Sequence, residues 1–116
     1  MAKYSYILVM PVPKDKIEAW RKVGALSGKI YVEHGALACN DWIADPEATP
    51  MGEVTGFQRS VHATEDEVIG VTEVVFASKE AAAAVNAAYE ADPRMAELSY
   101  QYDPKRAFYG GFELQG

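Results

Sequence analysis

Cysteine and histidine are scarce in this sequence, which has one of the first and two of the second among 116 residues. Cys39 has no partner in the chain for a disulfide, and few nitrogen and sulfur ligands are available for zinc. The short signatures of dinucleotide, phosphate-loop, zinc-protease and serine-hydrolase sites are absent as well. We therefore expect no metal, no cofactor and a reducing compartment.

Basic residues and long apolar runs are also in short supply. The 11 Lys and Arg are outnumbered by 17 Asp and Glu, which gives a formal net charge of -6. A chain with this balance is a poor partner for nucleic acid or for an anionic membrane surface. The first apolar run, residues 4–12, ends at Pro13 and is too short for a membrane span, and no small-residue cleavage pattern of a signal peptide follows it. The sequence predicts a cytoplasmic protein without nucleic-acid or membrane partners.

Apolar residues are plentiful by contrast. Hydrophobic residues make up 49% of the chain and charged residues 24%, the balance of an ordinary globular protein. A chain of this length buries a core without disulfides or metals, and it is too short for most multidomain enzymes. We expect one domain that spans residues 1–116.

Four segments have the branched and aromatic residues typical of β-strands. They are residues 4–12, 36–44, 68–77 and about 106–114. Alternation divides the first segment into two faces, Tyr4, Tyr6, Leu8 and Met10 on one and Ser5, Ile7 and Val9 on the other. Both faces are largely apolar, which indicates a strand covered on both sides. Gly110 and Gly111 in the last segment indicate a bulge or a close approach of another group to the backbone.

Two further segments have the apolar periodicity and the end signals of helices. The first begins at residues 13–15 and runs to His34, with Gly35 as its C-terminal cap. The second, residues 79–91, is rich in alanine and follows Ser78, a favourable N-cap residue. The order of elements is therefore β-α-β-β-α-β.

This order predicts an α+β, ferredoxin-like fold, in which two helices cover one face of a four-stranded antiparallel sheet. The opposite face is then bare, although its residues are apolar. An apolar patch of about several hundred Å² on a monomer is usually an interaction surface. We expect a second copy of the chain to cover it, which makes the protein a homodimer through the open sheet face.

Five segments together resemble a family of small bacterial proteins of unknown function, the DUF1428 or YbaA-like family. They are Pro11-Val-Pro-Lys-Asp-Lys16, Glu33-His-Gly-Ala-Leu37, Ala84-Val-Asn86, Ala91-Asp-Pro-Arg-Met95 and Lys105-Arg-Ala-Phe-Tyr-Gly-Gly-Phe-Glu113. The resemblance implies a dimeric α/β barrel, in which two ferredoxin-like sheets pack face to face. The wider superfamily includes cofactor-free monooxygenases, haem enzymes, isomerases and stress proteins, so kinship of fold selects no chemistry. The family offers no established catalytic residues to transfer.

His34 and Asp41 are the candidate catalytic bases. His34 ends the first helix, where it either complements the helix dipole or acts as a base at a cavity mouth. If the second and third strands pair, Asp41 and Glu73 could share one side of the sheet. Two facing carboxylates would have raised pKa values, which suits acid–base chemistry. The alternatives are a strand edge in water or a salt bridge to Arg59, Lys105 or Arg106.

Tyr6, Trp42 and Tyr109 are the candidate walls of a ligand site, with Arg59 as an anion partner. Packing in the core is the alternative for the aromatic residues. We expect Cys39 to be a small buried apolar residue and not a nucleophile, because no basic residue adjoins it.

Two classes of function follow from these candidates. The first is a homodimer that binds a small hydrophobic ligand between the sheet and the helices, with the loop of residues 45–58 as a lid. Its catalytic form is a cofactor-independent enzyme, similar to a monooxygenase or an isomerase, that uses His34 or Asp41 as a base. The second class is a non-catalytic dimer, a binding or stress-related module whose motifs serve folding and association. A cavity lined by the candidate residues would favour the first class.

Overall fold

The computed structural model describes residues 2–49, 51–53 and 56–116. Its strands and helices are β1 (Tyr4–Pro13), α1 (Ile17–Glu33), β2 (Ala38–Ile43), β3 (Glu67–Phe76), α2 (Lys79–Ala91) and β4 (Phe108–Glu113). Short 3-10 helices, η1 (Lys14–Lys16), η2 (Phe57–Arg59) and η3 (Pro93–Glu97), lie between them. The β-α-β-β-α-β order that the sequence predicts is confirmed.

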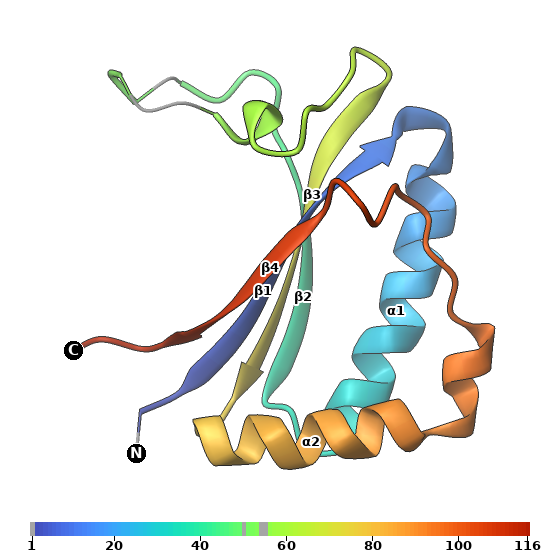
Figure 1. Cartoon of the computed structure of the whole chain (residues 1–116), viewed down its shortest axis with the longest axis vertical. Coiled ribbons are helices and arrows are strands. Elements are labelled where there is room, and N and C mark those ends of the chain that lie inside the picture. The colour runs from blue at the N-terminus through green and yellow to red at the C-terminus, as the bar shows by residue number, and fades with distance from the viewer. Residues whose placement is uncertain (1, 50, 54–55) are drawn as a thin grey trace.

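The four strands form one antiparallel sheet in the order β2-β3-β1-β4 (Figure 1). β1 is central and pairs with β3 along its whole length, from Tyr4 opposite Phe76 to Pro13 opposite Glu67. Each half of the chain contributes one central and one edge strand, joined across a helix. This is the ferredoxin-like α+β fold.

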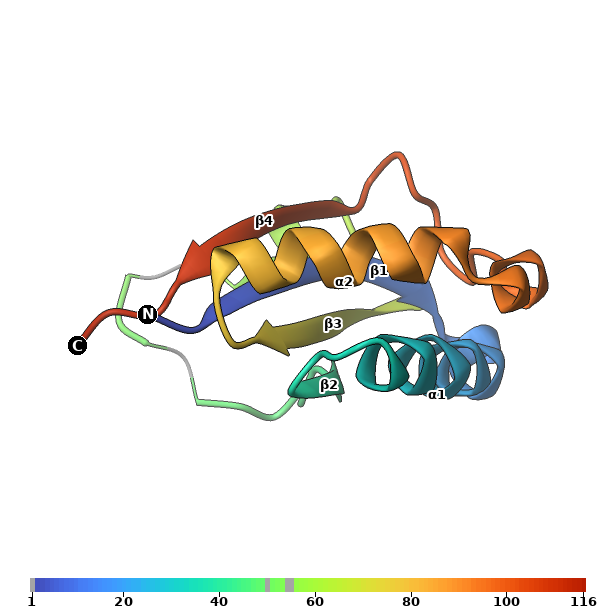
Figure 2. The same ribbon diagram turned by 90° about the horizontal axis from the view of Figure 1, so that it is seen from below.

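Both helices lie on the same side of the sheet, which we call the inner face (Figures 1 and 2). Val74 and Phe76 of β3 pack there against Ala82 and Val85 of α2. Met10 and Val12 of β1 pack against Trp20 near the start of α1. These strand residues alternate along the chain, as the period of a strand requires.

Within the described residues, neither helix is long and apolar enough to cross a membrane.

Local signals in the sequence fix the helix ends. Gly35 adopts a φ of 115°, a left-handed conformation that suits glycine, and the Ala36 N–H donates to the Tyr31 carbonyl at 2.9 Å. Ser78 Oγ accepts a hydrogen bond of 3.1 Å from the Ala81 N–H at the start of α2. Both predicted caps are confirmed.

The connection between β2 and β3 covers one end of the opposite face, which we call the outer face. Val61 is fully buried there against Val9 and Ile69. The predicted loop of residues 45–58 has no strand in its described part, and η2 begins at its end. Residues 50, 54 and 55 of that loop lie outside the described residues.

The rest of the outer face carries exposed apolar side chains, as the sequence predicts. They come from β2, from β4 and from the residue after β4: Trp42 (59% exposed), Phe108 (43%), Phe112 (55%) and Leu114 (60%). Ile7 and Val71 lie between them on the central strands. The sheet thus has one face packed on helices and one open apolar face.

The two glycines of β4 do not form a bulge, because their pairing with Tyr6 and Ile7 of β1 is continuous. Gly111 instead allows a close approach on the inner face. A Cβ at this position would overlap the phenol oxygen of Tyr4. Of the two explanations that the sequence allowed, close approach is the one that the structure shows.

Candidate functional site

A cavity of about 680 Å³ lies between the inner face of the sheet and the helices. Its floor includes Tyr6 and Leu8 of β1, one wall is the face of α1 around Ser27, and another is the end of α2 around Tyr89. The chain from Met95 to Tyr102 closes a further side. This volume is within the range of sites that hold small molecules. We call this space the inner cavity.

An aromatic pair joins the two helices at the wall of the inner cavity. The rings of Tyr31 on α1 and Tyr89 on α2 stack with centroids 3.8 Å apart and an interplanar angle of 9°. Ser27 Oγ and the Tyr89 hydroxyl share a hydrogen bond of 2.8 Å, and the Tyr31 hydroxyl donates to Asn86 Oδ1 at 3.5 Å. The pair therefore holds the two helices, and with them two walls, at a fixed separation.

Burial moves the pKa values of these phenols further above neutral pH. It raises the pKa of both Tyr31 and Tyr89, and it raises the pKa of Tyr102 to about 12. The phenols are therefore neutral at physiological pH and keep their hydroxyl protons. They offer the cavity uncharged aromatic surface and hydrogen-bond donors.

Asp41 of β2 faces the inner cavity. Its Oδ1 accepts a hydrogen bond of 2.6 Å from the Thr72 hydroxyl on the neighbouring strand. Gly24 of α1 leaves the space that the carboxylate occupies, because a Cβ there would overlap Asp41 Oδ2. Gly28, one turn later on the helix, lies against Cys39 in the same way but less tightly. The four-residue spacing of the glycines is a signal that sequence reasoning missed.

Tyr6 and Tyr109 also line the inner cavity, so three of the candidate residues meet there. Tyr6 packs edge-to-face on Phe76, with ring centroids 5.0 Å apart. Tyr109 of β4 is 74% exposed and belongs to the rim. The tryptophan that lines the cavity is Trp20, whose indole N–H lies 3.2 Å from the sulfur of Met10.

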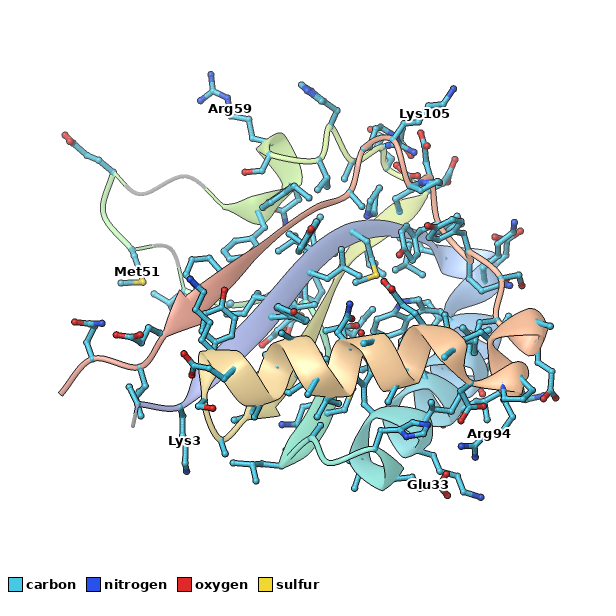
Figure 3. The ribbon with its side chains drawn as sticks, turned by 60° about the horizontal axis from the view of Figure 1, so that its bottom comes forward. Lys3, Glu33, Met51, Arg59, Arg94 and Lys105 are labelled. Carbon is cyan, nitrogen blue, oxygen red and sulfur yellow. The ribbon has the colours of Figure 1, made fainter. Side chains whose placement is uncertain are left out.

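Trp42 and Arg59 do not line the inner cavity. Trp42 pairs with Val71, and its alternation from Asp41 places it on the outer face. Arg59 belongs to η2, and Figure 3 shows it on the opposite side of the molecule from Arg94 of η3. The structure therefore separates these two candidates from Tyr6 and Tyr109, which line the inner cavity.

His34 is held in an ionic cluster on the surface instead of facing the inner cavity. Its Nε2 lies 2.8 Å from Asp92 Oδ2, and Arg94 contacts both Asp92 and Glu33, at 2.9 and 2.6 Å (Figure 3). Hydrogen bonds from Arg94 and His34 hold the pKa of Asp92 well below its usual range. The cluster ties the end of α1 to the start of η3. Of the two roles considered for His34, the structural one agrees with this geometry.

Asp41 and Glu73 do not share a side of the sheet. β2 and β3 do pair, but Asp41 is opposite Thr72, and Glu73 is opposite Asn40. Glu73 therefore lies on the outer face, where it accepts a hydrogen bond of 3.2 Å from the Asn40 amide. Arg106, one of the proposed partners, instead forms two hydrogen bonds to Glu67. The prediction that these two carboxylates face each other is therefore wrong.

Cys39 behaves as a half-buried apolar residue. Burial, with smaller contributions from Asp41 and Glu73, raises the pKa of its thiol to about 12. The prediction that it is no activated nucleophile agrees with this environment. In the described part of the chain, no three His, Cys, Asp or Glu side chains converge into a group that could hold a metal ion.

The sheet order, the two helices on one face and the cavity between them define a ferredoxin-like α+β protein with a candidate small-molecule site. Residues 3–105 match the family described as "Protein of unknown function (DUF1428)". The chain is 39% identical over 114 residues to "Uncharacterized protein YbaA" of Escherichia coli strain K12, which covers 96% of this chain and 95% of that protein. A protein of the same description from Shigella flexneri gives the same identity and coverage. The chain belongs to the DUF1428 family, as the sequence motifs indicate.

Proposed function

We propose that the protein binds a small, largely hydrophobic molecule in the inner cavity, and that it does so as a homodimer. The observation that carries the proposal is the cavity itself, which lies between the sheet and the helices and has aromatic side chains on several sides. A concave, mainly apolar site with a few polar groups is the usual form of a small-molecule site. Ser27, Asp41 and Thr72 supply polar groups that could orient the ligand.

The ligand proposal is tested with a neutral fluorescent probe, N-phenyl-1-naphthylamine. We expect its fluorescence to rise on binding, with about a tenfold loss of affinity in Val23→Phe, because Val23 lines the cavity and phenylalanine would fill part of it. Ala25→Phe is the matched control, since Ala25 is exposed on the same helix and does not line the cavity. Equal affinity of the wild type and Val23→Phe would overturn the proposal.

The open outer face supports the homodimer. Its exposed Trp42, Phe108 and Phe112 form an apolar surface on the sheet, and such surfaces favour association. Glu73 lies among them, and Glu67 at one end of the sheet is paired with Arg106. A nearly uncharged face lets a chain of net charge -6 meet its own copy without strong repulsion. Two sheets packed in this way would form the dimeric α/β barrel.

Sedimentation velocity at low micromolar concentration tests the assembly. We expect the wild type to sediment as a dimer and Phe112→Glu as a monomer, because the new charge would be buried at the interface. Val32→Glu is the control, since Val32 is exposed on α1, away from the outer face. A monomeric wild type would refute the homodimer and leave the ligand proposal to its own test.

A catalytic role is the alternative function, and the geometry narrows its base to Asp41. Asp41 lines the inner cavity with its carboxylate held by Thr72, whereas His34 is bonded to Asp92 outside the cavity. This alternative predicts turnover of a bound compound that Asp41→Asn abolishes while binding persists. A binding protein predicts no turnover in either form.

A further inference from the structure

We propose that the ligand of the inner cavity is an organic cation, an ammonium group attached to an apolar or aromatic body. The inference rests on the proposed function, because it assigns a chemical class to the molecule that the inner cavity holds. It is carried by three features of the cavity lining: the sign of its charges, the partners of those charges and the aromatic rings beside them.

The charged residues of the lining are all acidic. Asp41 contributes from β2 and Glu90 from the end of α2, and no lysine, arginine or histidine is among the described residues that line the cavity. A site with one sign of charge and apolar walls concentrates ligands of the opposite sign. An anionic ligand would meet two carboxylates with no cation to offset them.

Both carboxylates are oriented by neutral groups and keep their charge available. Asp41 accepts from the Thr72 hydroxyl at 2.6 Å, and Glu90 accepts from the Asn86 amide at 3.2 Å. Among the described residues, neither acid is part of a salt bridge.

Several acids elsewhere in the described chain are held in ion pairs by arginine. Arg94 pairs with Glu33 and Asp92, and Arg106 pairs with Glu67 and Asp103. The carboxylates of the inner cavity, like Glu73 on the outer face, are not held in such ion pairs, so a cationic ligand can supply their partner.

The aromatic lining suits the same ligand. Trp20, Tyr31, Tyr89 and Tyr102 all line the inner cavity, and each is buried or half-buried. Ring faces of tryptophan and tyrosine attract cations, most strongly where water is excluded. Rings and carboxylates together are the chemistry by which proteins recognise substituted ammonium groups.

The test compares three probes of similar size and shape but different charge: phenethylamine as the cation, 2-phenylethanol as the neutral molecule and 3-phenylpropionate as the anion. Each is titrated at pH 7 into the uniformly 15N-labelled protein, and amide shifts are followed by NMR. We expect phenethylamine to bind about fivefold or more tightly than 2-phenylethanol, and 3-phenylpropionate more weakly than both. The shifts should map to α1, α2 and residues 95–102.

Variants then assign the preference to the two acids. Asp41→Asn and Glu90→Gln should each reduce the ratio of cation affinity to alcohol affinity, and the double variant should bring that ratio near one. Glu65→Gln is the control, because it removes the same charge from an exposed turn outside the cavity lining. It should leave the ratio unchanged.

The outcomes separate this inference from the proposed function. If 2-phenylethanol binds in the inner cavity as tightly as phenethylamine, the proposal of a cationic ligand is refuted. The proposal that the inner cavity binds a small molecule then still holds. An unchanged ratio in the double variant would also refute the role of the acids. At 10 mM probe, the titration detects any binding stronger than about 3 kcal/mol. If no probe shifts a resonance of the cavity lining at that concentration, both proposals fail.

Discussion

Gly24 is placed to seat the carboxylate of Asp41, and replacing it with alanine tests that placement. A Cβ at residue 24 would overlap Oδ2 of Asp41 and lie 3.1 Å from its Cγ. The carboxylate would have to turn away, and its hydrogen bond from Thr72 would break. Glycine at residue 24 should therefore give a more stable protein than alanine only while Asp41 is present.

The expected magnitudes come from two opposing contributions. Alanine in a helix interior is favoured over glycine by about 1 kcal/mol, and a hydrogen bond to a charged acceptor contributes about 1.5 to 3 kcal/mol, less where solvent reaches it. With Asp41 present, we expect Gly24→Ala to leave stability unchanged or lower it by about 1 kcal/mol. In an Asp41→Ala background, the same change should raise stability by about 1 kcal/mol.

Urea unfolding followed by circular dichroism measures the change in unfolding free energy that Gly24→Ala causes with and without Asp41. The four proteins together form a double-mutant cycle. Gly28→Ala is the matched control, because a Cβ there would meet Cys39 Sγ at 3.4 Å, an ordinary contact. It should raise stability equally in both backgrounds. If Gly24→Ala changes the unfolding free energy equally with and without Asp41, Gly24 does not make room for the Asp41 carboxylate.

Three further predictions concern the core, the response to acid and the thiol. Gly70→Ala should lower the free energy of unfolding by about 1 to 3 kcal/mol in urea titrations, because its Cβ would lie 2.8 Å from the buried ring of Trp20; an unchanged midpoint would contradict the packing. Arg106 lowers the pKa of Glu67 to about 2 from 4.5, so the pair stabilises the fold fully above about pH 5, and its contribution is lost as the pH falls toward 2. The stability difference between the wild type and Glu67→Gln should therefore shrink over that range, and a constant difference would exclude the ion pair. Burial raises the pKa of Cys39 to about 12, so iodoacetamide at pH 8 should modify it far more slowly in the folded protein than in urea, and equal rates would show that the thiol is accessible.

Alternation along single strands was the most reliable information in the sequence. It placed Tyr6, Leu8 and Met10 on one face of β1, and the structure puts all three at the inner cavity. It also placed Asp41 and Trp42 on opposite faces of β2, as the structure has them. The caps at Gly35 and Ser78 followed from local backbone chemistry, which depends only on neighbouring residues. The position of the inner cavity then followed from the fold.

Relations between distant segments were beyond the sequence. Whether Asp41 and Glu73 share a face depends on the register of β2 against β3, and a shift of one residue reverses the answer. The bond between His34 and Asp92 joins residues 58 positions apart, and no local pattern marks it. Arg59 was a candidate because of its charge, but only the path of its loop decides whether it reaches the inner cavity.

The central position of β1 has a consequence for synthesis on the ribosome. β1 is made first, yet its neighbours in the sheet come from residues 67–76 and 108–113. At the usual rate of translation, β1 waits about 3 to 13 seconds for the strand that pairs with it first, and longer for β4. Helix α1, whose hydrogen bonds are local, can form during this interval. A nascent chain that stops before residue 67 therefore presents an apolar strand with both edges unpaired, and such an edge is a template for pairing with another chain.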